Sequence, residues 1–137
     1  FDTHSENFPR LRSLLPPFDR GLSALLDRLE ERGLLTSTAI LAAGEFGRTP
    51  KINGDGGRDH WARAMCALMA GGDIQTGQVI GTTDAIAAEP VSDGFSPDDL
   101  AASFFSNLGI PPDTVFESNT GRPITLVAQG KPIQQLF

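Results

Sequence analysis

The stretch "TSTAILAAGEFGRTPKINGDGGRDHW", residues 36–61, joins a short apolar run to a long loop that is rich in glycine and charge. Residues 36–44 are almost wholly apolar, and Ile40 and Leu41 favour a strand. Near-total apolarity predicts burial on both faces, as in a parallel sheet. In open α/β sheets ligands bind beyond the carboxyl ends of strands. The loop at residues 44–61 is therefore expected where active sites usually lie.

Helices are predicted on both sides of this strand. The stretch "LLPPFDRGLSALLDRLEERGLL" has leucines at helical spacing, with Pro16 and Pro17 suited to a first turn and Gly33 to a stop. The stretch "SPDDLAASFFSNLGI" begins with Ser96 as N-cap and ends at Gly109. Two helices alternating with short apolar segments predict an α/β protein.

The remaining segments predict fewer strands than a broad sheet needs. Residues 62–72 are compatible with a helix, but their position after a helix, strand and loop favours a second buried strand, with Cys66 as a buried inert thiol. We expect "GQVIGTTD" to be an edge strand or loop and the tail to hold one short strand. The chain also starts without methionine, so we expect one domain portion, residues 1–137, with the upstream part missing.

The composition excludes some classes of partner. The 137 residues have a net charge of −6 and a pI near 4.7, which argues against nucleic acid. A local basic pocket can still bind a small anion. No stretch is apolar for long enough to cross a membrane. The oligomeric state cannot be predicted from the sequence.

Four side chains are candidate ligands of a metal ion. His4 and His60 are the two histidines, and Asp2 precedes His4 by two positions, so both side chains point to one face of an extended segment. Glu45 directly follows the predicted strand. Zinc, manganese and iron accept such sets of nitrogen and oxygen ligands.

A purely structural interpretation of these residues stays open. In it His4 caps a turn, His60 packs against Trp61, and Glu45 pairs with Arg48.

The same loop holds a group of cations that could bind an anion. Arg48 and Arg58 have guanidinium groups whose fork geometry matches phosphate, sulfate or carboxylate, and Lys51 lies between them in sequence. Glycines nearby allow backbone N–H groups to approach an anion. The alternative is a solvated loop in which Arg48, Lys51 and Arg58 pair with its own acidic residues.

The order of several motifs resembles a known family. These motifs are "FDTHSENF", "GEFGRTPKIN", "GRDHW", "LMAGG", "GQVIGTTD" and "SPDDLAASFFSNLGI". Together they resemble the C-terminal part of the sulfatase-like proteins called domain of unknown function 1501, over nearly the whole chain. That family is placed near the alkaline phosphatase and sulfatase superfamily, so the resemblance implies a doubly wound α/β sheet and metal-dependent ester hydrolysis.

The resemblance also implies roles for individual residues. Asp2, His4 and His60 match positions that share a metal ion in that superfamily. A second ion is commonly held by an Asp-His pair after a buried strand, where this chain has Glu45-Phe46. The ion implied is zinc, manganese or calcium.

The resemblance leaves part of the machinery outside this chain. In that superfamily the nucleophile lies far upstream of the segment that residues 1–137 resemble, and Cys66 lacks the sequence context of the sulfatase nucleophile. Arg48 or Arg58 would stabilise the charge that builds on the transferred group.

These implications give two functional expectations. The first is part of a metal-dependent hydrolase of sulfate or phosphate esters, acting on a small anionic ester or sulfated carbohydrate. The second is a non-catalytic sulfatase-like protein that binds carbohydrate or anions. The resemblance further suggests a secreted or periplasmic protein.

Overall fold

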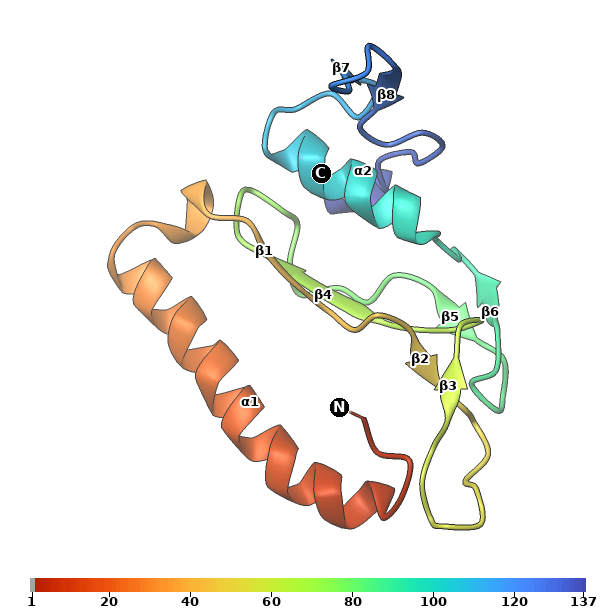
Figure 1. The fold of residues 1–137 in the computed structure, drawn as a ribbon. Coiled ribbons are helices and arrows are strands. Elements are labelled where there is room, and N and C mark those ends of the chain that lie inside the picture. The colour runs from red at the N-terminus through yellow and green to blue at the C-terminus, as the bar shows by residue number, and fades with distance from the viewer. Residues whose placement is uncertain (1) are drawn as a thin grey trace.

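The computed structural model describes residues 2–137 and is a mixed α/β structure (Figure 1). In the described chain, a long helix lies along one side of a narrow β ribbon, and a shorter helix lies beyond one end of that ribbon. The elements, in chain order, are α1 (Asn7–Glu31), η1 (Leu35–Ser37), β1 (Ile40–Ala43), β2 (Gly47–Arg48), β3 (His60–Trp61), β4 (Ala67–Ala70), β5 (Thr82–Thr83), β6 (Pro90–Ser92), α2 (Pro97–Asn107), β7 (Val115–Glu117), β8 (Pro123–Thr125) and η2 (Gln134–Leu136).

Helix α1 starts nine residues before the prolines that were predicted to open it. Pro16 and Pro17 lie inside the helix, although each lacks an amide N–H. The start is instead set by the loop, because the N–H of Asn7 donates to the carbonyl of Gly56 at 2.9 Å. At the other end Gly33 ends the helix as predicted, with φ of 65° and an N–H bonded to a helix carbonyl.

Helix α2 confirms its sequence signals. The Ser96 side chain accepts from the N–H of Asp99, and the Asp99 carboxylate accepts from the N–H of Ser96, so the two form a capping box. Pro97 begins the helix, and Gly109 follows its C-cap with φ of 74°. Both ends of α2 are therefore set by residues close to them in sequence, as predicted.

The prediction of a parallel sheet is wrong for the described residues. β1 pairs antiparallel with β4, with Ile40 opposite Ala70 and Ala43 opposite Ala67. β2 and β3 pair antiparallel inside this pair in sequence, so the chain runs out and back as an interrupted hairpin. A nested return of this kind forces the antiparallel direction. The second predicted strand is confirmed in β4, but β1 alternates between half-buried and exposed side chains.

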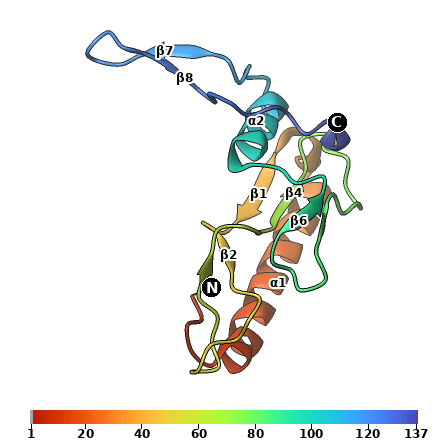
Figure 2. The same cartoon turned by 90° about the vertical axis from the view of Figure 1, so that its right-hand side faces the viewer.

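The second half of the chain adds two small hairpins and the main buried cluster. β5 pairs with β6, and β7 pairs with β8 in a hairpin that projects beyond α2 (Figure 2). The tail thus has two strands where one was predicted. The buried hydrophobic side chains of the described chain are Ile74, Ala102, Val127, Ile133 and Leu136.

Two further expectations meet the structure at this level. Cys66 is exposed, so the prediction of a buried thiol is wrong. It lies one residue before β4, in which Leu68 is also exposed. Among residues 2–137, no helix has both the length and the apolarity that a membrane crossing requires.

Candidate metal centre

The N-terminal segment packs on the glycine-rich loop, and this contact brings together residues that are about fifty positions apart in the sequence. Ser5 forms an antiparallel bridge with Gly56, and the N–H of Arg58 donates to the carbonyl of Thr3 at 2.9 Å. Thr3 is buried, and its hydroxyl donates to the Asn7 side chain at 2.6 Å. The close approach needs Gly57, because a Cβ there would lie 1.9 Å from the His4 carbonyl oxygen.

The β2–β3 hairpin supplies the other half of the site. Arg48 on β2 lies directly opposite His60 on β3. Gly47, beside Arg48, allows the ribbon to pack closely, since a Cβ would meet the Ala64 carbonyl oxygen at 1.7 Å. Trp61 is half-buried and donates through Nε1 to the Ala88 carbonyl at 2.7 Å, which fixes the ribbon against the next loop.

Three of the four predicted ligands come together. His4 Nε2 lies 3.0 Å from Asp2 Oδ1 and 3.1 Å from His60 Nε2, and His60 Nε2 lies 3.7 Å from Asp2 Oδ1. All three residues are exposed. The His4 and His60 rings lie in tilted contact with 4.8 Å between their centroids, and the His60 and Phe46 rings lie in tilted contact at 4.3 Å. Asp2, His4 and His60 are called the triad below.

Arg48 borders the triad and connects it to Glu45. Its Nη1 donates to Asp2 Oδ1 at 2.8 Å, and its Nη2 donates to Glu45 Oε1 at 3.4 Å. The hydrogen bond from Arg48 holds the pKa of Asp2 below its ordinary value, with help from the charges of His4, Arg48 and His60. Glu45 lies outside the triad and forms the pair with Arg48 that the structural interpretation anticipated.

Arg58 faces the inside of the loop. Its Nη1 donates to the backbone carbonyls of Thr49 and Pro50, the latter at 2.7 Å. The guanidinium therefore stabilises the path of the loop. Asp84 accepts from the N–H of Ala88 at 2.6 Å and holds its own turn.

Sequence reasoning missed the role of Asn53 and the partner of Asp59. Asp59 Oδ1 lies 2.9 Å from His4 Nδ1 and accepts from Asn53 Nδ2 at 3.1 Å. The signal for Asn53 was present, because asparagine followed by glycines is typical of side chain to backbone turns. The signal for Asp59 was not, since its partner is 55 positions away.

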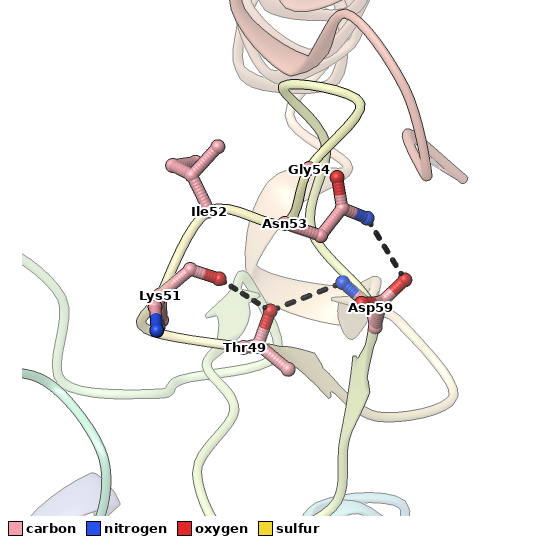
Figure 3. A pocket seen from close by; sticks show the side chains of 6 residues that line it. All are labelled: Thr49, Lys51, Ile52, Asn53, Gly54 and Asp59. Atoms are coloured by element: carbon pink, nitrogen blue, oxygen red, sulfur yellow. Dashed lines mark hydrogen bonds between the residues drawn. The ribbon is translucent and has the colours of Figure 1, made fainter.

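A hollow of about 370 Å³ opens beside Asp59 (Figure 3). In the figure the Asn53 amide points at the Asp59 carboxylate, and the Thr49 hydroxyl accepts from the Asp59 N–H at 3.1 Å. The hollow is lined by Thr49, Lys51, Ile52, Asn53, Gly54 and Asp59.

The comparison with protein families matches the whole chain. A family described as "Protein of unknown function (DUF1501)" matches residues 1–137. The chain belongs to this family. Among curated proteins and among solved structures, none matches the chain. Membership of the DUF1501 family agrees with the resemblance to that family, while the chemistry of the triad has to be argued from its geometry.

Proposed function

We propose that this DUF1501 chain provides a divalent metal centre for hydrolysis of a sulfate or phosphate ester. One observation supports the proposal most: two imidazole nitrogens and a carboxylate oxygen face one another at 3.0 to 3.7 Å. If His4 donates through Nδ1 to Asp59, its Nε2 is a lone pair directed at the Asp2 oxygen. Two such acceptors in contact repel one another unless a proton or a cation lies between them.

The spacing of the triad fits a small ion. Zinc binds histidine and carboxylate at about 2.0–2.2 Å in a tetrahedron, whose ligand atoms are then about 3.3–3.6 Å apart. The three separations in the triad bracket this range. A mixed set of imidazole and carboxylate ligands suits zinc best, manganese prefers oxygen ligands but accepts a mixed set, and calcium takes oxygen ligands. We therefore favour zinc or manganese over calcium among the three ions implied by the resemblance.

The chain's own residues account for orientation and charge around that ion. A bound ion of this kind polarises an ester and makes hydroxide available at neutral pH. Arg48 holds Asp2 in its ionised form and is the guanidinium nearest the triad, so we assign it to the oxygens of the sulfate or phosphate group. Arg58 supports the loop, and a role for it in charge stabilisation stays a prediction.

The resemblance extends the proposal beyond the described elements. We propose that the family's complete domain has an alkaline phosphatase-like sheet and that a small anionic ester or sulfated carbohydrate is the substrate. We also propose a secreted or periplasmic location.

Openness of the site favours a second candidate function. The side chains of Asp2, His4 and His60 are 68%, 46% and 55% exposed. Electrostatic catalysis gains most where water is excluded. A site this open suits non-catalytic binding of an anionic or sulfated carbohydrate through the same ion.

Metal content of the full protein tests the first step. We expect one zinc or manganese ion per chain by elemental analysis and its loss in His60→Ala, because that change removes one of three ligands. Asp55→Ala, a charge change in the same loop, is the matched control and should keep the ion. Glu45→Gln should also keep it, since Glu45 contacts Arg48.

Equal metal content in His60→Ala and the control would refute the ligand assignment. Assays with aryl sulfate and aryl phosphate esters then separate the candidates. Turnover by the unaltered protein that is lost in His60→Ala supports the hydrolase. An unaltered protein that binds the metal but turns over neither ester supports the non-catalytic binder.

A further inference from the structure

We infer that Asp59, anchored by Asn53, is a positioning residue that fixes the tautomer and orientation of His4 for metal binding. The inference rests on the proposed function and assigns to this pair a role that the sequence did not indicate. Asp59 Oδ1 lies 2.9 Å from His4 Nδ1, on the side of the ring opposite to the triad. Asp59 therefore contacts the His4 nitrogen that does not face Asp2 and His60.

The direction of the hydrogen bond between His4 and Asp59 follows from the other contact of Asp59 Oδ1. The Asn53 Nδ2 group, 3.1 Å away, can only donate, so Asp59 Oδ1 is an acceptor there and accepts from His4 Nδ1 as well. The proton of neutral His4 must then be on Nδ1. Its Nε2 is left as a lone pair toward Asp2 and His60, which is the form that binds a metal.

Asn53 fixes the carboxylate because all four sites of its amide bond within the structure. Its Oδ1 accepts from the N–H groups of Asp55 at 3.0 Å and Gly57 at 2.9 Å. Its Nδ2 therefore faces two oxygens, the His4 carbonyl at 2.9 Å and Asp59 Oδ1 at 3.1 Å. If the amide were flipped, its NH2 group would face two N–H donors and its oxygen would face two acceptor oxygens. Only the observed orientation forms all four hydrogen bonds.

These hydrogen bonds connect the loop to both the backbone and the ring of His4. Asn53 holds the His4 backbone directly and holds the His4 ring through Asp59. The Thr49 hydroxyl accepts from the Asp59 N–H and so fixes the backbone of Asp59 as well. Carboxylates that accept from a metal-binding histidine orient the ring and raise its basicity, and their loss typically weakens metal binding about 10–100-fold.

Nitrogen NMR of the metal-free protein tests the tautomer directly. At about pH 8.5, above the ordinary histidine range, we expect His4 to carry its proton on Nδ1. Spectra of His4→Ala and His60→Ala assign the signals of these two histidines. Asp59→Ala should release His4 into a mixture with the Nε2–H form. Asp59→Asn, which keeps an acceptor oxygen, should lie between the two.

Zinc affinity, measured by competition with a chromophoric chelator, tests the consequence. We expect Asp59→Ala to bind zinc about 10–100-fold more weakly, and Asn53→Ala to weaken binding in the same direction. The control Asp55→Ala changes the same charge in the same loop and should match the unaltered protein. Circular dichroism confirms folding, and if Asp59→Ala does not fold, Asp59→Asn decides in its place.

The NMR measurement and the zinc affinity distinguish a failure of the positioning role from a failure of the proposed function. An unaltered protein that binds neither zinc nor manganese refutes the proposed function, while the tautomer still tests the positioning role. Zinc binding that is equal in the Asp59 variants and the Asp55 control overturns the positioning role and leaves the metal centre intact. A His4 proton on Nε2 in the unaltered protein, or a tautomer unchanged in Asp59→Ala, also overturns it.

Discussion

At the scale of single residues, the alternation of an extended segment explains how Asp2 and His4 come together. The sequence predicted that these side chains share a face, and the structure confirms it with 3.0 Å between them. Thr3 points the other way and is 2% exposed. The metal role of the pair stays a prediction. The contact of Asp2 and His4 with His60 depends on the conformation of the loop, which sequence periodicity does not predict.

Close backbone contact at Gly57 gives a residue-scale prediction. Gly57→Ala places a Cβ 1.9 Å from the His4 carbonyl oxygen, so the N-terminal segment must shift. We expect a loss of about 1–3 kcal/mol in the free energy of unfolding, the usual range for overpacking, together with weaker zinc binding. Urea unfolding and chelator competition measure the two effects.

Gly54→Ala is the matched control for this change. A Cβ at Gly54 meets nothing within 4 Å, so stability and zinc affinity should be almost unchanged. Equal behaviour of the two variants would show that the segment and the loop are not in contact as described.

At the scale of elements, local signals predicted the helix ends that local chemistry controls. Ser96 and Gly109 bound α2 as expected, because capping needs only near neighbours. The start of α1 was missed, since the two prolines resembled a first turn. Hydrogen bonds from Glu6 and Asn7 to the distant loop fix that start instead, and long-range docking is invisible to a local pattern.

The capping box of α2 predicts a pH dependence of stability. Hydrogen bonds from the N–H of Lys131 and from Ser96 lower the pKa of Asp99 below its ordinary value of 3.8. A depressed folded-state pKa stabilises the fold above the unfolded value, and the benefit is lost as pH falls through the folded value. Asp99→Asn should cost roughly 0.5–1.5 kcal/mol at neutral pH, and less below pH 3.8.

Urea unfolding at neutral and acid pH checks this expectation. Asp98→Asn is the control, because it changes the same charge in the same turn and its side chain has no hydrogen bond among the described residues. A cost that is as large in acid as at neutral pH would contradict the assignment to the Asp99 carboxylate.

At the scale of the whole molecule, the sequence predicted the positions of the apolar strands but not their direction. β1 and β4 lie close to the predicted runs, yet both belong to one interrupted hairpin. Apolarity on both faces usually indicates a parallel sheet, and here it accompanies a ribbon with Leu41 and Leu68 at 39% and 55% exposure. Pairing is a relation between segments, so composition alone could not decide it.

The same limit applies to the site. Spacing and residue type nominated Asp2, His4, Glu45 and His60, and the structure brings Asp2, His4 and His60 together. The contact between Glu45 and Arg48 was an open alternative that only geometry resolves. The bond between His4 and Asp59 joins residues 55 positions apart, and its prediction needed the docking of the N-terminal segment.

The central claim is that the triad binds one divalent ion, and X-ray absorption at the zinc edge tests it most directly. For the zinc-loaded protein we predict two imidazole nitrogens and at least one carboxylate oxygen at about 2.0–2.2 Å. His4→Ala and His60→Ala should each remove one imidazole from the spectrum. A spectrum with no imidazole scattering, or one that neither substitution changes, would contradict the account.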